Sequence, residues 1–85
     1  MDKPHAFVLT LTGGATFDEI TLPTRIHRLV VKSKKNSSDI KLKFQNSETE
    51  LLIKIGNCYD SDTVDWRSPR VRVNGTGDID GEYWT

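Results

Sequence analysis

Apolar and polar residues alternate with a period of two along most of this chain. In residues 39–45, DIKLKFQ, the apolar side chains of Ile40, Leu42 and Phe44 share one face and the polar side chains share the other. Residues 70–74, RVRVN, repeat the alternation. A period of two is typical of a β-strand that has one face in a core and one face in water. The pattern therefore predicts a protein built from antiparallel sheets.

The same period predicts further strands elsewhere in the chain. Residues 25–34 depart from it, because Leu29, Val30 and Val31 run together. Such a run predicts either a strand covered on both faces for part of its length or a bulge that shifts the register. The other predicted strands are residues 7–12 with Phe7, Leu9 and Leu11 inward, 50–56 with Leu51, Ile53 and Ile55 inward, 17–22, 82–84 and, as an optional eighth strand, 62–66.

Turn-forming residues, among them Gly13, Pro23 and Gly75, separate these strands. Short strands with turns at intervals of roughly 8–12 residues are typical of β-sandwiches and small barrels. No segment shows a 3.6-residue apolar period, so we expect essentially no helix. The predicted fold is all-β: a single domain, residues 1–85, folded as an antiparallel, jelly-roll-like β-sandwich of about seven or eight short strands.

The size and composition favour a chain that gains stability from partners. Its 85 residues form one small core, and a core of this size often needs disulfides, a metal or further subunits. The single cysteine, Cys58, cannot form a disulfide within the chain and fits a reducing compartment. The N-terminal residues carry no signal-peptide pattern, and no segment is long and apolar enough to span a membrane. We therefore expect neither export through such a signal nor a membrane partner.

Acidic and basic residues cancel overall but are unevenly distributed. The chain has 12 Lys and Arg residues and 12 Asp and Glu residues. Eight of the basic residues lie in residues 25–54, and six of the acidic residues lie in residues 55–85. Such a split can orient one copy of a chain against another or against a larger partner, whereas a neutral chain has no general affinity for nucleic acid. We therefore expect no nucleic-acid partner.

Alternating acids near the C-terminus raise the question of a calcium site. Asp78, Asp80 and Glu82 have the spacing of ligands in a calcium loop. However, the full EF-hand series of ligands is absent, and in a strand these acids simply share one polar face. If the preceding glycine-rich segment is a turn, the acids lie across from Arg70 and Arg72 and form cross-strand ion pairs. We favour the ion pairs, expect no metal or other cofactor, and keep a calcium-stabilised domain as a third alternative.

Candidate catalytic groups are sparse. His5 and His27 lie far apart in sequence, and Cys58 has no basic residue within three positions that would activate its thiol. A nucleophile needs a base and a group that orients that base. We therefore expect no enzymatic activity.

Aromatic residues are few, and several lie near predicted loops or the C-terminus. Trp66, Tyr83 and Trp84 are expected to anchor an interface, because aromatic side chains are enriched at interface cores. The basic residues expected to form a rim or partner-facing surface with them are Lys41, Lys43, Arg70 and Arg72. Exposed aromatic rings can also stack on sugars. The alternative function is therefore a carbohydrate-binding β-sandwich module that uses Trp66 and Tyr59.

The order of features from Thr16 to the C-terminus carries a resemblance to a known group of proteins. A short strand leads into a proline, the run R-L-V-V-K and an asparagine, here Pro23, Arg28, Leu29, Val30, Val31, Lys32 and Asn36. An alternating strand follows, and the chain closes with a strand, a glycine turn and an aromatic arm. In this order the chain resembles small virion proteins of tailed bacteriophages. It departs from them at residues 41–52, where those proteins carry a glycine-rich segment, and at residues 60–70, which match no part of the pattern.

The resemblance implies a non-enzymatic structural protein of the phage particle. Head decoration or cement proteins and tail or fibre components are the kinds of protein it indicates, and these usually work as symmetric oligomers. The expected partners are therefore further copies of the chain and capsid or tail proteins. The expected location is the virion, after assembly in the host cytoplasm.

Overall fold

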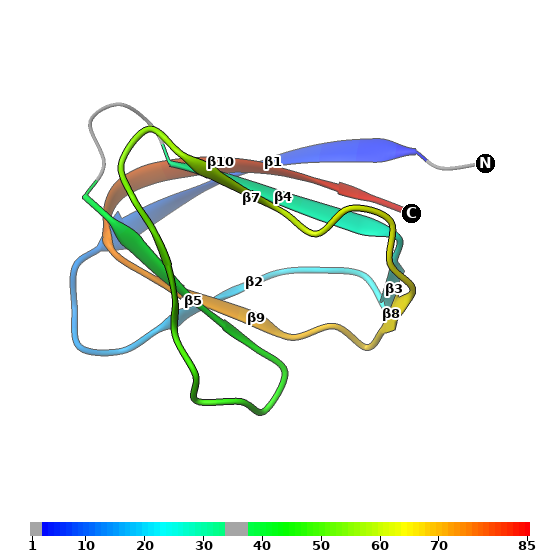
Figure 1. Cartoon of the computed structure of the whole chain (residues 1–85), viewed down its shortest axis with the longest axis horizontal. Coiled ribbons are helices and arrows are strands. Elements are labelled where there is room, and N and C mark those ends of the chain that lie inside the picture. Colours follow the sequence, from blue (N-terminus) through cyan, green and yellow to red (C-terminus); the bar gives the residue numbers. More distant parts are fainter. Residues whose placement is uncertain (1–2, 34–37) are drawn as a thin grey trace.

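The computed structural model describes residues 3–33 and 38–85, which fold into ten strands (Figure 1). The strands are β1 (Pro4–Thr12), β2 (Asp18–Ile20), β3 (Arg25–Ile26), β4 (Arg28–Ser33), β5 (Ile40–Phe44), β6 (Leu51–Ile53), β7 (Cys58–Asp60), β8 (Trp66–Arg67), β9 (Val71–Asn74) and β10 (Thr76–Trp84). The described residues contain no helix, and hence none long and apolar enough to cross a membrane. The predicted all-β class is confirmed. Asn36, part of the run that carries the resemblance, lies outside the described residues.

The described strands pair antiparallel and follow one simple order. The first strand pairs with the tenth, the second with the ninth, the third with the eighth, the fourth with the seventh and the fifth with the sixth. Two more pairings, β10 with β4 and β9 with β5, join these ladders side by side. The chain is therefore one long hairpin that is rolled up on itself. The jelly-roll prediction describes a wrapping of this kind, and the sandwich and jelly-roll assignments themselves stay predictions.

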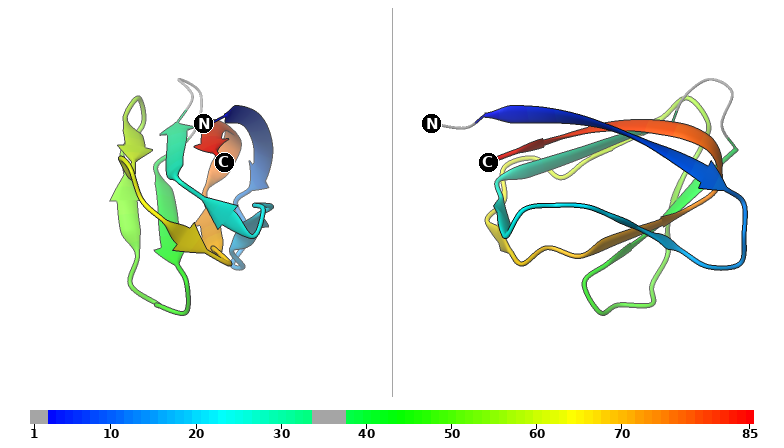
Figure 2. Two further views of the ribbon diagram at one scale, coloured as in Figure 1. Left: turned by 90° about the vertical axis from the view of Figure 1, so that its right-hand side faces the viewer. Right: turned by 180° about the vertical axis from the view of Figure 1, so that it is seen from behind.

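The rolled hairpin forms two four-stranded sheets. Sheet A has the order β1-β10-β4-β7 and sheet B the order β2-β9-β5-β6, while β3 and β8 form a short ribbon at one end. Figure 2 shows the two layers and the ribbon that closes the end of the space between them. The edge strands β1 and β2 lie together on one flank, and the edge strands β6 and β7 lie together on the other.

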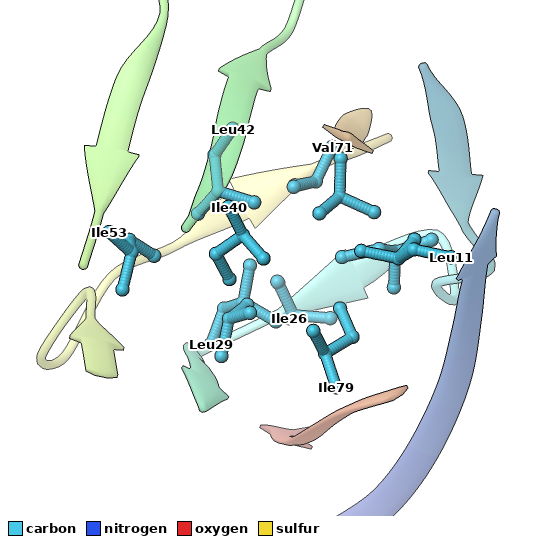
Figure 3. Packing of buried hydrophobic residues seen from close by; sticks show 11 residues of the cluster. Leu11, Ile26, Leu29, Ile40, Leu42, Ile53, Val71 and Ile79 are labelled. Carbon is cyan, nitrogen blue, oxygen red and sulfur yellow. The ribbon is translucent and has the colours of Figure 1, made fainter. Parts of the chain in front are cut away.

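Aliphatic side chains from both sheets fill the space between the layers (Figure 3). The inward positions predicted for residues 39–45 and 70–74 are confirmed, with Phe44 only partly buried. Burial of one aliphatic side chain stabilises the fold by about 1.5–3 kcal/mol, so this cluster is the main source of stability. Its buried members are Leu11, Ile20, Ile26, Leu29, Val31, Ile40, Leu42, Ile53, Val71, Val73 and Ile79.

The apolar run at residues 29–31 belongs to a strand that is covered on both faces. Leu29 and Val31 belong to the core cluster and are fully buried. Val30 points the opposite way and is only 7% exposed, because long charged side chains surround it on the outer face of sheet A. These charged side chains form the ion pairs Arg28–Asp60 and Lys32–Glu82. The first of the two predicted explanations of the run is therefore confirmed.

The flank between β6 and β7 is open, and this corrects the predicted burial of Leu51 and Ile55. These side chains are 40% and 49% exposed, whereas Ile53 between them is buried. β6 and β7 are edges of different sheets, and no described strand pairs with their outer sides. Leu51 lies opposite the buried Leu42 on the inner face of sheet B. It stays exposed all the same, because nothing described closes the gap between the two edges.

The glycine-rich segment after β9 is not the predicted hairpin turn. β9 ends at Asn74 and β10 begins at Thr76, yet the two strands belong to different sheets. Gly75 carries the chain across, in a position where a Cβ would lie 2.9 Å from Cγ2 of Ile40. The predicted cross-strand ion pairs of Arg70 and Arg72 with the acids of β10 are therefore wrong. Arg72 lies in β9 of sheet B and Arg70 directly precedes that strand, whereas sheet A carries Asp78, Asp80 and Glu82.

Gly81 allows the ring of Phe7 to lie against the backbone of β10. A Cβ at position 81 would overlap that ring and would lie 2.7 Å from the carbonyl oxygen of Val30. The backbone oxygen cannot rotate away as a side chain can. We therefore expect Gly81→Ala to lower the free energy of unfolding by about 1–3 kcal/mol in urea denaturation. The control is Gly14→Ala, where the nearest atom lies 4.0 Å from the added Cβ. Equal stability of the two variants would contradict this prediction.

Candidate interaction surfaces

The two C-terminal aromatic residues predicted to anchor an interface lie on opposite faces of sheet A. Tyr83 packs against the core, and its ring stacks on that of His5 with centroids 5.0 Å apart. Trp84 points outward, and the guanidinium of Arg28 lies 5.0 Å from its ring centroid. Both aromatic side chains are half-buried. Neighbours within the chain therefore hold both rings in place, and part of each ring stays accessible.

Trp66 packs within the chain, at the junction of β5, β7 and β8. Its ring centroid lies 5.9 Å from that of Phe44, which in turn lies 5.2 Å from that of Tyr59. Burial, and then the charge of the neighbouring Asp60, raise the pKa of the Tyr59 hydroxyl, which stays neutral. Because Phe44 already contacts both rings, the geometry gives only weak support to a sugar-stacking platform on Tyr59 and Trp66.

The four basic residues predicted to form a charged surface gather on the outer side of sheet B. Two of them project into solvent, and each has an acidic neighbour. Nζ of Lys41 lies 3.9 Å from a carboxylate oxygen of Glu50, and Nε of Arg70 lies 2.8 Å from one of Glu19. Exposed ion pairs of this kind contribute little to stability, and a partner can displace them cheaply.

The other two basic residues, Lys43 and Arg72, are covered. They lie opposite one another in register, and their side chains are only 15% and 14% exposed. Glu48 bridges them, with one carboxylate oxygen 2.7 Å from Lys43 Nζ and the other 3.4 Å from Arg72 Nη1. Arg72 also donates to the carbonyl oxygens of Gln45 and Ser47. The hydrogen bond from Lys43, and then the two positive charges, hold the pKa of the Glu48 carboxyl below its usual range. This pair therefore fixes the β5–β6 loop over the sheet.

The alternating acids of β10 lie on the outer face of sheet A, apart from these cations. Oγ1 of Thr10 donates to Asp78 at 2.8 Å, and Nζ of Lys32 lies 3.3 Å from a carboxylate oxygen of Glu82. Asp80 follows between them along the strand. Within the described ranges, no three His, Cys, Asp or Glu side chains gather closely enough to hold a metal ion. Local hydrogen bonds and ion pairs thus account for Asp78 and Glu82.

A groove of about 240 Å³ runs between the edge strands β6 and β7. Both strands line it, with Leu51, Leu52 and Ile53 on one side and Tyr59 on the other. Leu52 is 48% exposed, and Ile55 lies just beyond at 49%. Of the four large hydrophobic side chains that are strongly exposed in the described chain, three lie on this flank. Lys54, Asn57 and Cys58 also line the groove, so it is a mixed surface on which exposed hydrophobic side chains gather beside polar ones.

The alternation of residues 50–56 did not predict this groove, because the pattern assigns Leu51 and Ile55 to the core. The available signal was the dipeptide Leu51-Leu52. Successive side chains of a strand point to opposite faces, so two adjacent large apolar residues cannot both enter a one-sided core.

The candidate catalytic residues lie far apart. His5 lies on β1, at one edge of sheet A, and its Nε2 is 3.0 Å from the hydroxyl oxygen of Thr85. Cys58 is exposed on β7, at the opposite edge of the same sheet.

Comparisons of the chain with protein-family models, with curated proteins and with solved structures found no match. Function is therefore inferred from the surface chemistry of the chain itself.

Arg28 and Asp60 form a two-bond ion pair on the outer face of sheet A. Nε of Arg28 donates to Oδ1 of Asp60 at 3.0 Å, and Nη2 donates to Oδ2. These bonds, followed by one from the backbone N–H of Asp62, lower the pKa of Asp60 to about 2. We predict that Arg28→Met raises this pKa toward its ordinary value of 3.8, as measured by NMR titration of the carboxyl carbon.

The stability profile should change in the same variant. Because the pKa of Asp60 is lowered on folding, the stabilisation from this pair is complete above the ordinary value of 3.8 and is lost as the pH falls toward 2. Arg28→Met should flatten that acid limb. The control, Arg25→Met, breaks the similar ion pair with Asp65, whose pKa is also lowered. This control should leave the pKa of Asp60 unchanged. An Asp60 pKa that stays near 2 in Arg28→Met would contradict the assignment.

Proposed function

We propose that this chain is a non-enzymatic structural protein of a tailed-bacteriophage particle, which self-associates and binds a larger capsid or tail assembly. The observation that carries the proposal is the cluster of exposed hydrophobic side chains, Leu51, Leu52 and Ile55, at the groove between β6 and β7. Contiguous exposed apolar surface with a polar surround is typical of protein contact sites. The resemblance of residues 16–85 to phage virion proteins supplies the kind of assembly.

The chemistry of the groove suits an extended apolar segment of a larger protein. Its walls are two sheet edges, where backbone groups are available to a further strand. Its lining combines hydrophobic side chains, among them the buried Ile53 and the half-buried Tyr59, with the polar Asn57. Lys54, which also lines the groove, forms an exposed ion pair with Asp39, with the two charged atoms 3.4 Å apart. Burying the apolar walls would favour association at about 25 cal/mol per Å², and the polar surround would orient the partner.

The size of the chain gives a second reason for a partner. A single core of this size supplies only about 3–5 kcal/mol of net stability. A partner that binds the folded state alone adds stability by mass action. The proposed assembly would therefore stabilise the folded chain as well as attach it to the particle.

The particle itself provides the test. Antibodies raised against the chain should detect it in phage particles banded on a density gradient, from a lysate of the culture whose genome encodes it. A chain that stays entirely at the top of the gradient would overturn the virion role.

The groove is tested by Leu52→Lys in the same particles. Leu52 is 48% exposed, so the substitution should leave the melting temperature of the purified chain unchanged. It should reduce the amount of chain on banded particles by roughly tenfold, the effect expected from the loss of one interface anchor. Thr63→Lys adds the same charge at an exposed loop position and is the control. Equal amounts of the two variants on the particles would contradict the proposal that the groove binds the particle.

A further inference from the structure

The outer edge of β1 is a long row of backbone groups with no strand partner among the described residues. In sheet A, β1 pairs only with β10. Lys3 and Thr85 exchange two backbone hydrogen bonds, N to O at 2.9 and 3.0 Å, in the register that continues along β1 and β10. In an antiparallel ladder such bonded pairs alternate with unbonded ones. The odd-numbered residues of β1 therefore bond to β10, and the N–H and C=O groups of Ala6, Val8 and Thr10 point away from the sheet.

Beyond Pro4, which begins the strand and has no N–H, this edge lacks the usual protection against pairing with another chain. Proteins blunt exposed edges with lysine, proline, bulges or very short strands. β1 is nine residues long, whereas the other edge strands, β2, β6 and β7, have three residues each. Residues 5–12, HAFVLTLT, contain no Lys, Arg, Asp, Glu or Pro. Val8, in the middle of the edge, is 65% exposed.

The inner side of the same edge is also incompletely covered. Phe7 and Leu9 face the core but are only partly buried, because β1 and β2 leave a groove of about 120 Å³ between them. Ile20 of β2 lines the same groove. A strand added beside β1 would supply side chains to this groove as well as hydrogen bonds to the edge.

We propose that β1 pairs with β1 of a second copy of this chain, antiparallel, about a two-fold axis at Val8. This proposal rests on the self-association in the proposed function and names the surface responsible. In this register Val8 faces its own counterpart, and Ala6 faces Thr10 of the other copy. Each of these pairs exchanges two N–H···O=C bonds, because all three residues present both groups on the free edge. The two copies of sheet A become one eight-stranded sheet.

The side chains fit a second copy better than an unrelated strand. On the outer face, the exposed Val8 covers its counterpart, a β-branched pair that suits adjacent strands. On the inner face, Phe7 of one copy lies beside Leu9 of the other, over the groove next to β2. Residues 5–12 contain no Lys, Arg, Asp or Glu, so the pairing brings no like charges together within this segment. The contact uses the same strand of both copies, so it closes at two and leaves no β1 edge for a third.

Proline substitution tests the edge directly. The N–H of Val8 points outward, so Val8→Pro removes an intermolecular donor and no bond to β10, as tolerated on edge strands. Val8→Thr keeps the donor and the β-branched shape and is the matched control. In sedimentation equilibrium under reducing conditions, which exclude disulfides through Cys58, wild type and Val8→Thr should have twice the monomer mass. Val8→Pro should be monomeric with an unchanged far-ultraviolet circular dichroism spectrum.

Hydrogen exchange of the wild-type chain gives a readout that needs no variant. In the dimer the amides of Ala6, Val8 and Thr10 should be protected, and dilution to the monomer should expose them while the amide of Leu9 stays protected. A wild-type chain that is monomeric at high micromolar concentration would overturn the proposal, as would unprotected Ala6 and Val8 amides in a dimer.

The outcomes also separate this proposal from the proposed function. A monomer that still bands with phage particles would remove the β1 pairing and the self-association but leave the particle role. A dimer that survives Val8→Pro would overturn the β1 pairing alone. Leu52→Lys, on the opposite flank, should dimerise as wild type does, and its loss of dimer would count against the β1 edge.

Discussion

Antiparallel pairing between the two halves of the chain is the constraint on which this structure depends. Every ladder of the described chain joins one of the strands β1–β5 to one of the strands β6–β10, and only β5 and β6 are neighbours in sequence. Neither half can complete a sheet alone, so chain entropy is lost before most contacts form. β10 has the most demanding position, since β1 and β4 bond to it on both sides and Phe7 lies against Gly81.

The sequence predicts the features of this fold that depend on local periodicity. Alternation correctly identifies the buried faces around Leu42 and Val73, because a strand turns successive side chains to opposite faces whatever lies next to it. It does not reveal which strands become neighbours. Arg70 and Asp80 are close in sequence, yet Gly75 sends the chain into the other sheet between them. Burial also depends on a distant neighbour, and for this reason Leu51 is exposed although it faces inward.

The candidate interaction surfaces are less predictable from the sequence than the fold. Residue types suggest aromatic anchors and a basic rim, but the structure holds Trp66 against Phe44 and covers Lys43 and Arg72 with a loop tied by Glu48. Those contacts follow from register, which composition does not encode. The apolar flanks arise instead where sheets end, at β6 and β7 on one side and at β1 on the other. A surface defined by the end of a sheet is visible only once the strand order is known.

The pairing of Lys3 with Thr85 has a mechanical consequence. Lys3 and Thr85 lie side by side at the open end of the β1–β10 ladder, where they exchange hydrogen bonds. A force that pulled Lys3 and Thr85 apart would break this ladder one residue pair at a time, instead of loading all its hydrogen bonds together in shear. Each backbone hydrogen bond contributes only about 1 kcal/mol net, so the ladder has little resistance to such peeling. In any assembly under tension, load would therefore have to pass across the sides of this protein and not along its backbone.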